Sequence, residues 1–314
     1  MARKLILDVD TGTDDAVAIM FAALHPGLDL VGVTTVAGNV GVDATTDNTL
    51  RVLDWIGHAE IGVFKGLARP VGRAGLPGQR HYRQGGSMDP HGGALPIPEP
   101  TSAHRDTGAI EFLVETLRAT TEKITLVPVG PLSNIATALA VDPSLTEAVD
   151  EIVIMGGGHA VGNVTASAEF NVWADPEAAA LVLSAGFARL TLVPLDATHQ
   201  ALIGQDTCDA LAELGTPAGT AAARFIGRRI AAYDEITGGG TAPVHDVVCT
   251  AYLVAPEIIT TRHLPVDVET VSPLTIGRTV VDTRPQSTAE RNAHVAFGAD
   301  AAMLAKLLLD TFGG

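Results

Sequence analysis

Residues 4–24 read KLILDVDTGTDDAVAIMFAAL. The apolar run Leu5-Ile6-Leu7 predicts a buried strand over 4–9, and apolar residues at helical spacing predict a helix over 15–24. Gly12 allows the chain to turn tightly between the two. A buried strand that turns directly into a helix is typical of the first unit of a parallel α/β sheet.

The same alternation continues to residue 195. Strands are expected over 30–36, 124–129, 151–155 and 190–195, and helices over 43–56, 106–121, 131–141 and 175–185. Residues 200–260 are expected to be mainly helical, 265–298 to contain short strand-like runs, and 299–310 to form a final helix. This order predicts an α/β fold: a single domain over 1–314 with a mainly parallel, Rossmann-like sheet flanked by helices. Its active site should lie at the C-terminal ends of the strands.

The composition excludes several classes of protein. A chain of 314 residues with 46% hydrophobic and 18% charged residues can bury a large core. With 20 Lys and Arg against 36 Asp and Glu, its net charge of −16 argues against nucleic acid as a partner. No apolar run approaches the roughly 20 residues of a membrane helix. We therefore expect a cytoplasmic protein that binds neither nucleic acid nor membrane.

One long segment differs from the rest of the chain. Residues 67–100 are rich in Gly, Pro, Arg and His and show no clear periodicity. A connection of this length is seldom passive. We expect a mobile active-site loop.

Four carboxylates, those of Asp8, Asp10, Asp14 and Asp15, lie within eight residues at the end of the first strand. Charges this close repel one another unless a cation or several donors compensate. Capping of the next helix explains one or two of them, but not Asp8 and Asp10 as well. The cluster favours Ca²⁺ or Mg²⁺, which take oxygen ligands. The lack of a nearby His or Cys disfavours zinc.

Seven motifs follow one another along residues 4 to about 260 in an order that resembles the inosine-uridine nucleoside N-ribohydrolase family. They are DxDxGxDDAxAI at 8–19, AGN at 37–39, GPLSNIA at 130–136, IMGGG at 154–158, GNVT at 162–165, EFN at 169–171 with DPEAA at 175–179, and HD at 245–246.

The resemblance implies Ca²⁺-dependent hydrolysis of the N-glycosidic bond of ribonucleosides, through an oxocarbenium-like transition state, to ribose and free base. One Ca²⁺ per subunit would be bound by Asp10, Asp15, Asp246 and the backbone carbonyl of Val129. Asp10 would also act as the general base on a metal-activated water, and His245 would protonate the leaving base. The resemblance further implies a homodimer or homotetramer that takes part in nucleoside salvage.

The same resemblance implies a set of substrate-binding residues. Asp14 would bind the ribose 2′-hydroxyl, and Met155 would lie along the sugar. The remaining members of the set are Asn39, Asn163, Glu169, Phe170 and Asn171. Taken singly, Asn163 fits a Gly-Asn turn and Glu169 fits a loop cap, but their joint placement with His245 and Asp246 favours binding of the substrate.

Base preference stays open at the level of sequence. Many relatives carry a histidine in a His-Gly-x-x-Gly-Leu run near the base, but the matching stretch at 85–93 has none in that place. His81 and His91 are the candidates to replace it. Tyr233, upstream of His245, fits either stacking on a base or packing in the core.

Three other functions compete with this one. Residues 8–13 loosely match the motif of haloacid-dehalogenase phosphatases, but no lysine lies between Lys123 and Lys306 to complete such a site. A hydrolase of another N-ribosyl compound and a non-catalytic Ca²⁺- and ribose-binding protein are the other two.

Overall fold

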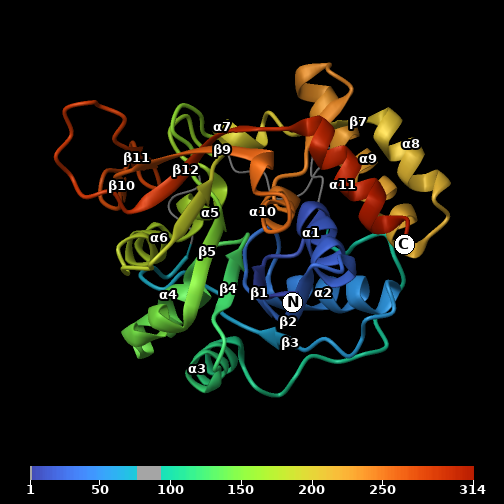
Figure 1. The fold of residues 1–314 in the computed structure, drawn as a ribbon, viewed down its shortest axis with the longest axis horizontal. Helices are drawn as coiled ribbons and strands as arrows, with labels where there is room; N and C mark the ends of the chain where they lie inside the picture. Colours follow the sequence, from blue (N-terminus) through green and yellow to red (C-terminus); the bar gives the residue numbers. More distant parts are fainter. Residues whose placement is uncertain (1, 76–92) are drawn as a thin grey trace.

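Strand β1 (Arg3–Val9) lies inside an eight-stranded sheet, because it pairs in parallel with both β2 (Leu28–Thr35) and β4 (Ile124–Pro128). The computed structural model describes residues 2–75 and 93–314 (Figure 1). The strand order is β3-β2-β1-β4-β5-β6-β12-β9, and only β9 runs antiparallel to its neighbour. The other strands are β3 (Val63–Lys65), β5 (Val149–Met155), β6 (Leu190–Val193), β12 (Ala293–Ala299) and β9 (Ile259–Leu264).

Helices cover both faces of this sheet, and each face has its own core. Leu5 and Leu7 of β1 belong to one core and Ile6 to the other, because successive side chains of a strand point to opposite faces. The first core packs against α1 (Thr13–Leu24), α2 (Val42–Trp55), α9 (Pro217–Thr237), α10 (Val247–Tyr252) and α11 (Ala301–Phe312). The second packs against α3 (Ala109–Ala119), α4 (Ser133–Val141) and α6 (Pro176–Leu183).

Shorter elements complete the described chain. Helix α8 (Gln205–Glu213) packs on α9, while α5 (Phe170–Ala174) and α7 (Leu195–Thr198) are single turns after β5 and β6. Two 3₁₀ turns occur at η1 (Pro143–Ala148) and η2 (Pro256–Ile258). Two small antiparallel sheets pair β7 (Leu202–Gly204) with β8 (Thr241–Pro243), and β10 (Val266–Val268) with β11 (Thr279–Val281).

The predicted α/β class with a mainly parallel sheet is confirmed, and so are the strands and helices predicted up to residue 195. The prediction of a mainly helical 200–260 is confirmed by α8, α9 and α10, but it missed the short strands β7 and β8 and the start of β9. Strands of three residues are too short to give a periodic signal, and β7 and β8 are stabilised by pairing with each other across α8 and α9.

Half of the loop predicted over 67–100 lies outside the described residues, and its described parts, 67–75 and 93–100, contain neither helix nor strand. Across 2–75 and 93–314, no helix combines the length and the apolar character that a membrane crossing requires.

Candidate active site

The site forms where the chain leaves β1 and β4. Helix α1 follows β1 onto one face of the sheet, and α4 follows β4 onto the other. Neighbouring parallel strands whose connections diverge in this way leave a crevice at their carboxyl ends, and ligands bind there. The acidic motif follows β1, and Val129 directly follows β4, its N–H donating to the Asp8 carbonyl oxygen at 2.8 Å.

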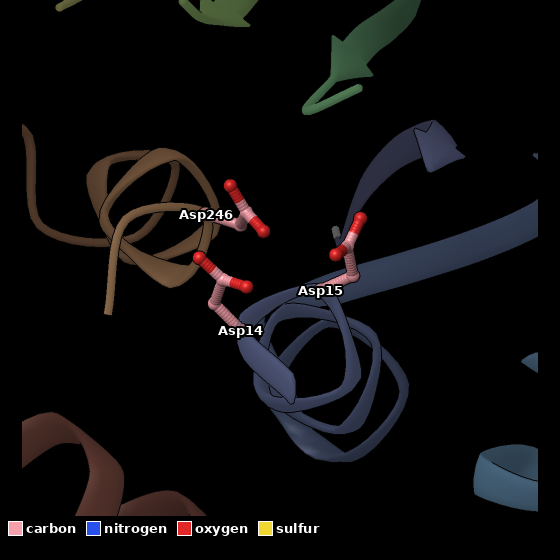
Figure 2. A group of neighbouring side chains, drawn as sticks. All are labelled: Asp14, Asp15 and Asp246. Atoms are coloured by element: carbon pink, nitrogen blue, oxygen red, sulfur yellow. The ribbon is translucent and has the colours of Figure 1, made fainter. Parts of the chain in front are cut away.

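Three carboxylates from two helix ends meet in this crevice. Asp14 and Asp15 lie in the first turn of α1, and Asp246 directly precedes α10. One carboxylate oxygen from each lies within 4.8 Å of the other two, and Figure 2 shows the three side chains directed toward a common space. All three residues are at most 4% exposed. Within 2–75 and 93–314 this is the one group of three or more acidic, His or Cys side chains placed to bind a metal ion together.

Asp10 lies directly against this group. Its backbone N–H donates to Asp15 Oδ1 at 3.1 Å, and its own Oδ2 accepts from the Asn39 N–H at 2.6 Å. The Asn39 side-chain amide also donates to Asp15 Oδ2 at 3.3 Å. The structure therefore brings Asp10, Asp15 and Asn39 together, as the sequence predicts.

Two glycines provide the space that Asp10 occupies. A Cβ atom on Gly38 would overlap with the Asp10 carboxylate, and a Cβ atom on Gly130 would lie 2.8 Å from Asp10 Oδ1. Real Cβ atoms essentially never come so close to a neighbour. The AGN and GPLSNIA motifs thus contribute bare backbone against which the Asp10 side chain packs.

Burial and mutual repulsion both make it unfavourable for the carboxylates of this cluster to carry their charges. Burial, followed by repulsion from Asp14, raises the pKa of Asp15 to about 7. Burial, followed by repulsion from neighbouring aspartates, also raises the pKa of Asp10 and of Asp246 well above the usual range. Buried carboxylates with only oxygen atoms to offer fit a hard divalent cation, which would relieve this repulsion.

Asp8 is separate from the group. Thr34 Oγ1 and Asn134 Nδ2 both donate to its Oδ1, at 2.6 and 2.7 Å, and burial raises its pKa to about 7. It belongs to the packed interior below the crevice, where it is 1% exposed. Two donors hold its Oδ1, and it lies outside the group of the described residues that could bind a metal ion, so a role as phosphatase nucleophile has no support here.

Glu169 caps a helix. Its carboxylate accepts from the N–H groups of Gly157, Asn171 and Val172 at 2.8 to 3.2 Å, which holds the start of α5. Burial raises its pKa to about 7. Asn163 Oδ1 accepts from the Phe170 N–H at 2.9 Å. Glu169 and Asn163 therefore both form structural hydrogen bonds within the loop and the start of α5. Their contact with ribose stays a prediction.

Asn171 links the carboxyl ends of β4 and β5. Its Nδ2 donates to the carbonyl oxygens of Val129, at 2.8 Å, and Met155, at 3.2 Å, and lies 3.4 Å from the Met155 sulfur. The predicted metal-binding carbonyl and two predicted sugar contacts are thus neighbours. Phe170 packs beside Trp173 in a small separate core and anchors this loop.

His245 directly precedes Asp246 in the chain, and each of its ring nitrogens has a hydroxyl group as partner. Thr198 Oγ1 lies 2.7 Å from Nδ1, and the Tyr233 hydroxyl lies 3.4 Å from Nε2. Tyr233 therefore points its polar end at His245. The sequence gives no sign of Thr198, because it reaches His245 only through the packing of α7.

Arg229 is a second residue that the sequence analysis missed. It is 2% exposed, and its Nη1 lies 2.9 Å from Asp14 Oδ1. A signal was available, because Arg229 lies three and four residues from the apolar Ile226 and Phe225, on the buried stripe of α9. A charged residue in such a stripe needs a buried partner.

Comparison with known proteins identifies the family. The sequence matches the model of the inosine-uridine preferring nucleoside hydrolases over residues 5–306. The chain belongs to this family. It is 40% identical over 281 residues to a pyrimidine-specific ribonucleoside hydrolase, RihB, of Escherichia coli strain SE11, which covers 89% of this chain and 87% of that protein.

Solved structures of nucleoside hydrolases are similar throughout. A purine-preferring ribonucleoside hydrolase from Gardnerella vaginalis superposes with a TM-score of 0.88 at 30% identity, covering 99% of this chain and 98% of that chain. A plant nucleoside hydrolase, PpNRh1, gives the same TM-score at 28% identity over the whole of both chains. The predicted family is confirmed, together with the prediction of a hydrolase that cleaves N-glycosyl bonds.

Part of the predicted base-binding region cannot be placed. The candidates His81 and His91 lie outside the described residues.

Replacing Gly38 with alanine tests the packing around Asp10. The added methyl group would displace the Asp10 carboxylate, and misplacing a reacting group by about 1 Å costs roughly 100-fold in rate. We expect kcat to fall by about that factor in Gly38→Ala while the melting temperature changes little. Gly41→Ala is the matched control in the same loop, since a Cβ atom there meets nothing within 4 Å. Equal kcat values for the two variants would contradict this account of Asp10.

Protonation of these carboxylates predicts how the stabilisation of the folded protein by a bound metal ion depends on pH. Because the raised pKa of Asp15 lies at about 7, the metal-free folded protein holds protons there at pH 5 and releases them as the pH rises through 7. A cation must displace these protons, so its stabilising effect should grow with pH. We expect the rise in melting temperature on adding Ca²⁺ to chelator-treated protein to be small at pH 5 and large at pH 8. A rise that is the same at both values would show that these carboxylates do not bind the ion.

Proposed function

We propose that this nucleoside hydrolase converts ribonucleosides to ribose and free base with the help of one Ca²⁺ ion. The observation that carries the proposal is the convergence of the buried carboxylates of Asp14, Asp15 and Asp246, with Asp10 hydrogen-bonded to Asp15, in a chain that belongs to this family. Negative charge in that place suits a reaction whose transition state places positive charge on the sugar.

Asp10, Asp15, Asp246 and the carbonyl oxygen of Val129 would hold the ion. All four offer oxygen, the ligand atom that Ca²⁺ prefers, and all four lie at the carboxyl ends of β1 and β4 or at the starts of α1 and α10. When bound, the ion lowers the pKa of a coordinated water and so provides a nucleophile near neutral pH.

Residues around the crevice would bind and orient the substrate. Asp10, held by the Asn39 N–H and two glycines, accepts the proton of the attacking water. Asp14 receives the ribose 2′-hydroxyl. The other ribose contacts would come from Asn39, Asn163, Glu169 and Asn171, with Met155 along the sugar and Phe170 anchoring their loop.

His245 would donate a proton to the departing base. Its ring is held between the hydroxyl groups of Thr198 and Tyr233, so both its orientation and its proton can be controlled. The Tyr233 hydroxyl extends this chain of hydrogen bonds, which supports a polar role for Tyr233 in place of simple core packing.

Pyrimidine ribonucleosides are the proposed preferred substrates. The identity of 40% with an enzyme named as pyrimidine-specific supports this choice over the 30% shared with a purine-preferring one. The expected homodimer or homotetramer and the role in nucleoside salvage rest on the resemblance alone, and the cytoplasmic location stays an expectation from the sequence.

A substrate panel tests the function directly. The purified protein is incubated with uridine, cytidine, inosine, adenosine and guanosine, with and without a Ca²⁺ chelator, and the released reducing sugar is measured. We expect release that the chelator abolishes and added Ca²⁺ restores, fastest for uridine or cytidine. Faster release from inosine would contradict the pyrimidine preference. No release from any of the five would favour a modified N-riboside or a binding protein.

A pair of conservative substitutions tests the mechanism. Asp10→Asn removes the general base and a metal ligand, so kcat should fall by about 100- to 10,000-fold. Asp8→Asn changes a buried aspartate outside the metal-binding group and should leave most of the turnover intact. A phosphatase would show the opposite order and would release phosphate. Equal kcat for Asp10→Asn and the parent protein would contradict the mechanism.

A further inference from the structure

Geometry alone does not distinguish Asp14 from the two aspartates beside it. The carboxylates of Asp14, Asp15 and Asp246 lie within 4.8 Å of one another, and all three point to the same space (Figure 2). A divalent cation placed there would take all three as ligands. The proposed function nevertheless gives Asp14 a different role, as a partner of the ribose. Some other group must therefore hold Asp14 back from the metal.

Arg229 contacts Asp14 and is itself firmly held. Its Nη1 lies 2.9 Å from Asp14 Oδ1 and 3.4 Å from Thr13 Oγ1, while its Nε donates to the Pro243 carbonyl oxygen at 2.9 Å. Its guanidinium carbon also lies 5.9 Å from the centre of the Tyr233 ring. Contacts from α1, β8 and α9 thus fix a buried cation beside one particular carboxylate of the cluster.

An ion pair of this kind competes with metal binding. Arg229 and Asp14 form a buried ion pair, and a guanidinium group cannot lose its charge. The oxygen that it holds is less available to a cation, because moving it would leave a buried arginine without its partner, which is strongly unfavourable. Asp15 and Asp246 form no ion pair with Arg229 in the described residues, and Arg229 acts on Asp246 only at longer range, through its charge.

We infer that Arg229 is a positioning residue that keeps Asp14 out of the metal's coordination shell and reserves it for the ribose. The inference rests on the proposed function for the roles of the metal and the sugar. It also accounts for the charge of the site. With a dication and Arg229 in place, the carboxylates of Asp10, Asp14, Asp15 and Asp246 leave one net negative charge. This matches the single positive charge that develops on the sugar.

A double-mutant cycle on Ca²⁺ binding tests the inference without using turnover. The dissociation constant for Ca²⁺ is measured by titration calorimetry on chelator-treated wild type, Arg229→Met, Asp14→Asn and the double variant. Removing Arg229 releases Asp14 to bind the ion, and Ca²⁺ affinity rises with the number of charged ligands. We expect Arg229→Met to tighten binding about tenfold more when Asp14 is present than when Asn replaces it.

Kinetics provide a second readout that a purely structural arginine would not give. In Arg229→Met the Asp14 carboxylate is drawn to the ion, so kcat should fall even though the metal is bound more tightly. Arg229→Lys keeps a cation beside Asp14 and should return Ca²⁺ affinity to the wild-type value.

Controls separate this effect from loss of charge or of fold. Arg228→Met removes the same charge from the next, exposed position of α9 and should leave Ca²⁺ affinity unchanged. If Arg229→Met does not fold, as judged by circular dichroism, Arg229→Gln takes its place in the cycle, because it is neutral but keeps hydrogen-bonding groups.

Three outcomes would overturn the inference. Equal tightening with and without Asp14 would mean that Arg229 acts only by its charge at a distance. Weaker binding in both backgrounds would mean that it only supports the fold. A wild type that binds no Ca²⁺ would remove the competition that the inference describes. In contrast, a protein that shows the expected cycle but cleaves no nucleoside would contradict the proposed function and leave the role of Arg229 intact.

Discussion

The burial of four carboxylates in one small volume is the constraint on which the rest of the site depends. Asp10, Asp14, Asp15 and Asp246 are each at most 4% exposed, so water cannot screen their repulsion. The protein relieves it by several means together. Backbone N–H groups bind Asp10 and Asp15, a buried arginine pairs with Asp14, and oxygen atoms remain available for a cation. Each of these partners determines the role that is open to the carboxylate it contacts.

The sheet makes this concentration of charge sterically feasible. Strands β1 and β4 are adjacent and parallel, and their helices leave toward opposite faces, so the space above the strand ends stays open. Gly38 and Gly130 then bring bare backbone up to Asp10 from two loops. The first turn of α1 is stabilised by Asp15, whose Oδ2 accepts from the Gly12 N–H at 2.9 Å. One side chain thereby caps a helix and faces the site.

The fold and the acidic group could be predicted from the sequence, because both depend on local patterns. Alternating strands and helices give the sheet, and Asp10, Asp14 and Asp15 lie in one short motif. The tertiary partners could not be predicted in the same way. Thr198 meets His245 because of how α7 packs, and Glu169 is occupied by the N–H groups of α5. Arg229 was detectable as a charge on an apolar stripe, but nothing local to it indicates that Asp14 is its partner.

The order of these residues along the chain has a consequence for biosynthesis. Asp10, Asp14 and Asp15 leave the ribosome first, while Arg229 and Asp246 follow only after most of the chain has been made. Strand β12, which joins β6 to β9, is made later still. Domains generally fold as units from the N-terminus during synthesis. Here Asp14 is made long before Arg229, its cationic partner, and the acidic group is complete only with Asp246, so the site cannot assemble until most of the chain has been made. A chain that ends before residue 229 would therefore lack the cation that pairs with Asp14.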